Sequence, residues 1–134
     1  MGEPKYDNPV YSIEQMLIGD RSGAINGTVA ATELMRYTMN KAGAVNKAKI
    51  RAAIGGTEAS IRQILLGKSL AGTGAFSVLG TQALGTLANG NIVDWAVTGS
   101  YLAGDDLVIQ HLGTGAAVYD IEVQVYYQQA FVNG

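Results

Sequence analysis

The sequence predicts an all-β domain built as an antiparallel β-sandwich, and three observations support this prediction. First, apolar and polar side chains alternate along residues 119–128, which gives a β-strand one apolar face and one hydrated face. Second, residues 47–54 alternate in the same way, with the basic side chains on one face. Third, turn-forming residues separate the apolar segments at the short spacing typical of sandwiches and barrels. The length of 134 residues fits one domain, which can bury a core without disulfides.

Residues 1–27 differ from the rest of the chain, so we divide it into an N-terminal arm, 1–27, and a sandwich domain, 28–134. The start of the arm is polar and contains both prolines, so it should be extended. Ser12 and Gln15 fit a capping box, and a glycine follows soon after, which predicts one short helix over 12–18. Such a short helix is marginal in isolation, so the arm should become ordered by docking. The side chains expected to make that contact are the apolar ones of the arm, Val10, Ile13, Met16, Leu17 and Ile18.

The sandwich domain is predicted to contain a series of strands separated by turns. The first segment places two methionines and a tyrosine on one side, and the second directs lysine and arginine side chains outward. The next two are apolar and bounded or interrupted by glycines, and the fifth has Trp95, Val97 and Tyr101 on one parity. The segments are, in order, 33–39, 47–54, 60–66, 75–87, 92–102, 107–112 and 119–131. The side chains predicted to be buried include Ile50, Ile54, Trp95, Val97, Ile121, Val123 and Val125.

Two of these segments have a competing interpretation as helices, namely 29–40 and 57–67. Both are rich in good helix formers, and Thr57 could cap the second helix. The order of apolar residues in 61–66 does not alternate well, so a strand there would need a β-bulge. The sequence leaves both alternatives open.

Charged residues are few and unevenly distributed. All nine lysines and arginines lie between Lys5 and Lys68, whereas residues 71–134 carry only acidic charges. One interpretation is that solvated strand faces neutralise each other, and another is that a basic patch meets an acidic patch on a neighbouring subunit. Nucleic-acid binding is disfavoured because the basic residues are not interleaved with aromatic ones and the sequence pI is about 5.2. No apolar run is long enough for a membrane span.

The residues that catalysis would need are scarce. The single histidine, His111, lies in a predicted strand, so a half-buried side chain is a better interpretation than a general base. Without cysteine the chain cannot offer an ordinary Cys/His zinc site. Asp105 and Asp106 could supply oxygens to calcium, but adjacent aspartates at the start of a strand more often cap a turn. We therefore predict no enzyme activity, no catalytic residues, no cofactor and no metal.

Two pieces of the sequence resemble small trimeric jelly-roll domains. Residues 34–50 resemble the opening hairpin of such domains, in which a turn containing Lys-Ala-Gly leads into a strand of alternating basic and apolar residues. Residues 102–109 resemble the Gly-Asp element that precedes a late strand in tumour-necrosis-factor-like and complement-type globular heads. Similar jelly rolls occur in bacteriophage capsid decoration (cement) proteins and in fibre heads. The resemblance covers about residues 32–130, and the family heads are usually richer in aromatic residues.

The resemblance implies an antiparallel jelly-roll β-sandwich and two alternative functions. The first is a structural virion protein on the capsid surface, a decoration or cement protein that stabilises a phage head. It would bind the major capsid protein or another shell protein as a homotrimer, with the arm side chains named above as shell contacts. The alternative is a trimeric fibre head or lectin-like module that binds a receptor or a glycan. The aromatic residues that could stack sugars are Tyr6, Tyr11, Tyr101, Tyr126, Tyr127 and Trp95. The arm favours the first, because nothing in the family heads parallels it. Neither function implies nucleic acid or a membrane as a partner.

Overall fold

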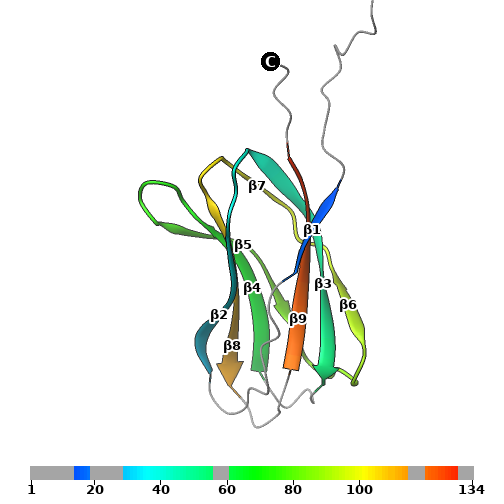
Figure 1. Ribbon diagram of the computed structural model, residues 1–134. Coiled ribbons are helices and arrows are strands. Elements are labelled where there is room, and N and C mark those ends of the chain that lie inside the picture. The colour runs from blue at the N-terminus through cyan, green and yellow to red at the C-terminus, as the bar shows by residue number, and fades with distance from the viewer. Residues whose placement is uncertain (1–13, 19–28, 56–60, 115–119, 130–134) are drawn as a thin grey trace, which may run out of the picture.

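The computed structural model describes residues 14–18, 29–55, 61–114 and 120–129, and this part of the chain is all-β without helix (Figure 1). Nine strands form two antiparallel sheets that pack face to face. Sheet 1 has the order β1-β9-β3-β6, with β7 also paired to β3, and sheet 2 has the order β2-β8-β4-β5. The strand bounds are β1 Gln15–Ile18, β2 Val29–Thr38, β3 Gly43–Ile54, β4 Ile61–Ser69, β5 Phe76–Ala83, β6 Ile92–Trp95, β7 Gly99–Tyr101, β8 Asp106–Thr114 and β9 Asp120–Gln129.

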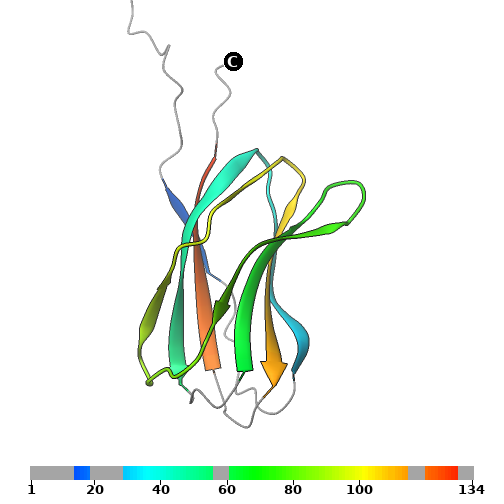
Figure 2. The same cartoon turned by 180° about the vertical axis from the view of Figure 1, so that it is seen from behind.

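The strand order confirms the predicted jelly-roll sandwich. The chain crosses between the sheets at almost every connection, so that strands distant in sequence become neighbours, such as β3 and β9 or β2 and β8. This interleaving of two Greek keys defines a jelly roll. Seen from behind, the two sheets face each other, and β5 and β6 lie along the same side of the sandwich (Figure 2).

The helix predicted over 12–18 is wrong where the structure describes it. Gln15–Ile18 forms β1, which pairs antiparallel with β9 at the edge of sheet 1. The edge of β9 supplies backbone partners for the whole segment, which outweighs a helical capping pattern of marginal stability. Glu14, just before β1, accepts a hydrogen bond from Asn46 Nδ2 at 2.7 Å and lies 3.8 Å from Lys47 Nζ. These contacts fasten the start of β1 across β9 to β3.

The two segments with alternative helical interpretations are strands, β2 and β4. In β4, Arg62, Ile64 and Leu66 are all buried, so its poor alternation arises because a charged side chain takes an inward position. The β-bulge expected in 61–66 is absent, since β4 pairs with β8 without a register shift, and the bulge in the β4–β5 pairing has its extra residue, Leu79, on β5. In β2, a register shift between Glu33 and Met35 buries Leu34 and changes which residues face the core.

The core lies between the sheets and contains six of the seven side chains predicted to be buried. The exception is Ile54, which is 40% exposed. A register shift between Ala52 and Ile54 at the end of β3 breaks the alternation, so Ile54 leaves the inward face. The predicted strand 92–102 is two strands, β6 and β7, but its three large side chains are buried as predicted.

Apolar residues occupy both faces of β8 at its start. Leu107, Val108 and Ile109 are all fully buried within this single chain, although Val108 is not part of the core cluster. Leu112, further along β8, is partly exposed.

Candidate interaction surface at the loop end

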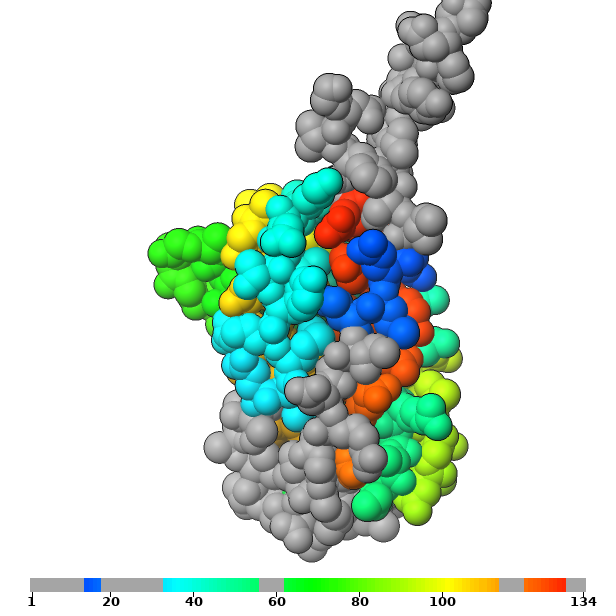
Figure 3. Space-filling view, in the orientation of Figure 1, coloured from blue at the N-terminus to red at the C-terminus, as the bar shows by residue number. Residues whose placement is uncertain are grey.

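Three connections gather at one end of the sandwich, and we call this end the loop end. They are the β2–β3 turn, 39–42, the β4–β5 hairpin loop, 70–75, and the β7–β8 turn, 102–105 (Figure 1). The hairpin formed by β4 and β5 projects from the body of the molecule (Figure 3). The space-filling view shows it as a separate protrusion beside the other two turns.

Asp105 ties the three connections together. Its carboxylate accepts backbone hydrogen bonds from Leu102 at 2.9 Å and from Ala71 at 3.0 Å, which joins the hairpin loop to the β7–β8 turn. Its backbone carbonyl accepts from Met39 at 2.8 Å, and Gly104 donates to the Met39 carbonyl at 2.7 Å. The side chain is 3% exposed, and the two N–H donors, of Leu102 first and then Ala71, lower the pKa of its carboxyl. The turn-capping interpretation of this aspartate is confirmed.

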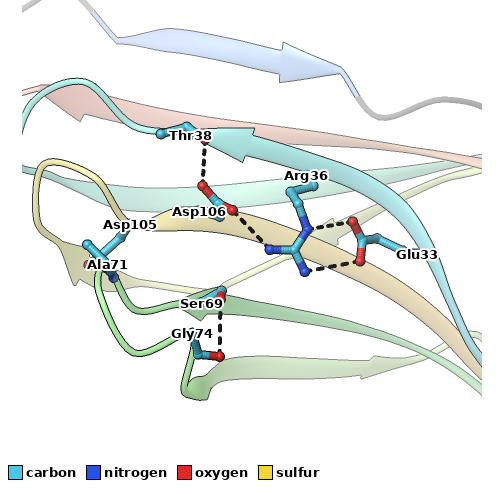
Figure 4. A network of polar contacts seen from close by, with 8 residues as sticks. All are labelled: Glu33, Arg36, Thr38, Ser69, Ala71, Gly74, Asp105 and Asp106. Atoms are coloured by element: carbon cyan, nitrogen blue, oxygen red, sulfur yellow. Dashed lines mark hydrogen bonds and ion pairs between the residues drawn. The ribbon is translucent and has the colours of Figure 1, made fainter.

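Asp106 anchors the start of β8 to β2 (Figure 4). Thr38 Oγ1 donates a hydrogen bond to its carboxylate at 2.6 Å, and Arg36 donates another at 2.9 Å. Arg36 also donates two hydrogen bonds to the Glu33 carboxylate, at 2.7 and 3.2 Å. The hydroxyl of Thr38 and then the guanidinium lower the pKa of Asp106. The charges of Glu33, Arg36 and Asp106 are thus engaged with each other rather than offered to a partner.

The exposed surface of the loop end is mostly apolar, and Lys41 is the one exposed charged side chain among its described residues. Leu102 is 67% exposed, and it borders an open pocket of about 350 Å³ whose other walls include Gly43, Tyr101 and Gln128. The hairpin loop belongs to a run of residues, 69–93, that contains no Asp, Glu, Lys, Arg or His. This surface was not predicted from the sequence, although the uncharged run 69–93 is a signal of it. Rigid loops with exposed apolar side chains are suited to contact another protein.

The residues predicted to contact a shell are only partly within the described part of the chain. Met16 and Leu17 are on β1, where Met16 is 43% exposed and Leu17 packs against the core. Ile18 ends β1, and its side chain is not described, whereas Val10 and Ile13 lie outside the described residues. Gln15 pairs with Tyr127, which also pairs with Val45 near the start of β3, so β1 enters sheet 1 close to the loop end.

The groups considered for catalysis or metal binding are placed as follows. His111 is fully buried on β8, and desolvation followed by the charge of Arg62 lowers its pKa to about 4. It therefore has no contact with solvent as a general base would need. Within the described ranges, no group of three or more His, Asp or Glu side chains could hold a metal ion. The described part also contains no helix long and apolar enough to cross a membrane.

The aromatic residues considered for glycan stacking are mostly in the core. Trp95, Tyr101 and Tyr127 are buried. Tyr126 is on the outer face of sheet 1, where Lys47 and Lys49 lie 4.8 and 5.9 Å from its ring centroid. Tyr6 and Tyr11 lie outside the described residues. Of the aromatic residues named for glycan stacking, only Tyr126 is therefore seen at the surface in the described part of the chain.

Comparison with known proteins gives matches among solved structures alone, since no protein-family model and no curated protein matches the chain. The structure is similar to a chain in the structure of infectious bursal disease virus, Gx strain, with a TM-score of 0.43 and 10% identity over 99% of this chain and 37% of that one. It is also similar to a chain in the infectious bursal disease virus VP2 subviral particle, with a TM-score of 0.23 and 10% identity over 95% of this chain and 43% of that one. The chain thus spans less than half the length of these viral chains.

Proposed function

We propose that the protein is a structural component of a virion, a decoration or cement protein that binds a phage head as a homotrimer and stabilises it. The observation that carries the proposal is the loop end. It joins three connections, bound together by Asp105, into one surface that carries an exposed leucine and, among the described residues, one exposed charged side chain, Lys41. A surface of this kind matches the apolar, charge-depleted centre of a stable protein–protein contact.

The N-terminal segment supports the same orientation. β1 enters the sandwich close to the loop end, so residues 1–13 are connected to the molecule at the end that carries the apolar surface. Thirteen residues can span at most about 45 Å when extended, which is enough to reach beyond the footprint of a small domain. In this proposal the loop end rests on the shell protein, and Val10 and Ile13 add contacts around it.

The proposal is tested by binding purified protein to assembled shells that lack it. Leu102→Asp introduces a charge at the loop end, and Ile92→Asp introduces the same charge at a side chain that is 57% exposed on β6, away from the loop end. We expect Leu102→Asp to weaken shell binding by at least about tenfold, the loss expected for burying a charge in place of a leucine, and Ile92→Asp to bind like the unchanged protein. Equal binding by both variants would contradict the proposal. Binding to a glycan array without binding to shells would favour the fibre-head alternative.

A second experiment addresses the arm. Deleting residues 1–13 removes Val10 and Ile13 but keeps Glu14 and β1, so sheet 1 should stay intact. We expect the shortened protein to keep its fold and bind shells more weakly. Undiminished binding would remove the arm from the contact and leave the loop end as the attachment surface.

A further inference from the structure

β5 is an edge strand of sheet 2, and its side away from β4 pairs with no strand in the described part of the chain. An edge strand offers a row of backbone N–H and C=O groups to any other strand. Natural proteins usually protect such edges with charged side chains, proline, a β-bulge or a very short strand. β5 has eight residues with no charged side chain or proline, and its one bulge lies after Val78, so Phe76–Val78 remains a regular edge.

The first half of β5 also exposes apolar side chains. Phe76 is 43% and Val78 is 52% exposed, and both face outward, whereas Leu79 packs against the core. The ring of Phe76 lies against Gly67 of β4, where any Cβ would collide with it. Phe76 is therefore held flat on the outer surface of sheet 2, beside an unpaired edge.

The register of β5 limits which strand can pair with it. The bulge opposite Leu66 and Gly67 interrupts the alternation after Val78, so the regular edge consists of Phe76–Val78 and the residues next to them. If a second β5 pairs antiparallel about Ser77, Phe76 of one copy lies opposite Val78 of the other on the same outer face. All four side chains then form one apolar cluster across a two-fold axis. Pairing about Val78 would instead set outward Phe76 opposite inward Gly80.

We propose that β5 is a contact between two copies of this chain, in which the two strands pair about Ser77 and join two copies of sheet 2 into one continuous sheet. The absence of charge along 69–93 removes the like-charge repulsion that would otherwise oppose two identical edges. On a shell this contact would link neighbouring decoration units. Its placement on a shell is the one part of the proposal that rests on the proposed function. The contact itself belongs to the free protein.

The experiment measures the mass of the purified full-length protein by sedimentation over a range of concentrations. Val78→Lys places a charge at the centre of the contact, and Thr81→Lys places the same charge on the exposed outer side of β5 beyond the bulge. We expect the unchanged protein and Thr81→Lys to form species with an even number of chains. Val78→Lys should weaken that association by about tenfold or more, because two valines lose their burial in each contact.

The outcomes separate this contact from the proposed function. The proposal would be overturned if the protein stays monomeric, or forms only a trimer, at concentrations of about 100 μM. A Kd above this concentration corresponds to a free energy of association smaller than about 6 kcal/mol. Equal weakening by both lysine variants would overturn the register about Ser77. Circular dichroism of Val78→Lys checks that the sandwich is intact. Shell binding of the unchanged protein is measured separately. A protein that self-associates but does not bind shells contradicts only the proposed function, and one that binds shells without this self-association contradicts only the β5 contact.

Discussion

The carboxylate of Asp105 satisfies two backbone N–H groups that belong to different connections of the loop end. Asp105→Ala leaves both donors without this acceptor in a buried position, so the free energy of unfolding should fall by about 2–4 kcal/mol. Urea unfolding at pH 7 measures this loss. Ser69→Ala is a suitable control, because its hydroxyl makes only a peripheral 3.3 Å bond to the Gly74 carbonyl within the same loop. A loss below about 0.5 kcal/mol for Asp105→Ala, as for an ordinary surface change, would contradict the role assigned to the carboxylate.

The lowered pKa of Asp105 also predicts how the stability of the folded state changes in acid. Because the folded state lowers this pKa, the carboxylate contributes stability above its unfolded pKa of about 3.9, and this contribution is lost as the pH falls through the folded value. Asp105→Ala should therefore differ from the unchanged protein less at pH 2 than at pH 7. A difference that does not shrink in acid would show that the ionised carboxylate is not what stabilises the turn.

His111 predicts a separate loss of stability at a higher pH. Its folded pKa is lowered to about 4, so between about pH 6.5 and 4 the unfolded chain binds a proton that the folded chain does not. The free energy of unfolding should fall through this window by up to about 3 kcal/mol, and His111→Gln should flatten the fall. Unfolding at pH 7 and 4.5, together with an NMR titration of the imidazole, checks the prediction. A folded-state midpoint near 6.5 would refute it.

At the scale of the strands, the start of β3 depends on a close approach. Gly43 pairs with Tyr101 of β7 and Gln129 of β9. A Cβ at Gly43 would collide with the Gln128 carbonyl oxygen and the Tyr101 hydroxyl, so Gly43→Ala should cost about 1–3 kcal/mol. At Gly72 a Cβ meets open space, and Gly72→Ala should cost only about 1 kcal/mol of backbone strain at its φ of 83°. Thermal unfolding of the two variants ranks them, and the reverse order would contradict the packing at Gly43.

β1 is short, but it completes the edge of sheet 1. Deleting residues 1–18 removes its pairing with β9 and the packing of Leu17, so the sandwich should lose about 1–3 kcal/mol relative to the deletion of residues 1–13. Urea unfolding of the two deletions isolates the contribution of β1, because both lack the same first segment. Equal stability would mean that β1 adds nothing to the folded domain.

At the scale of the whole molecule, several of the described charges are paired within the chain. Lys47 lies near Glu14, Lys49 lies 3.9 Å from Asp94, and Arg36 binds Glu33 and Asp106. This arrangement fits the interpretation that strand faces neutralise each other. An attachment through the mostly apolar loop end should therefore change little between about 50 mM and 1 M salt, a range over which the Debye length falls several-fold. Shell binding measured across this range checks the prediction, and a steep loss with salt would instead favour a basic patch that meets an acidic partner.

The alternation of side chains determined much of the fold from the sequence alone. β3 and β9 could be predicted, with most of their buried residues, because a strand with one buried face must alternate whatever its partners are. β6 and β7 were predicted as one strand, and β8 was predicted as an apolar segment between turns. The turn role of Asp105 could also be predicted, since a short carboxylate beside a glycine commonly caps a turn. The uncharged run 69–93 is also visible in the sequence, although its role as a surface depends on where the β4–β5 hairpin lies in the fold.

Only the tertiary structure decided the features that depend on partners distant in the chain. β1 is a strand rather than a helix because β9, more than 100 residues later, offers it a free edge. β2 and β4 are strands because β8 lies between them and pairs with both. Arg62 on β4 is buried, which the local sequence pattern does not predict. Ile54 is exposed because a bulge in the β3–β9 pairing shifts its side. The loop end and the open edge of β5 likewise exist only once the sheets are assembled, because each is formed by chain segments that the jelly-roll topology brings together or leaves unpaired.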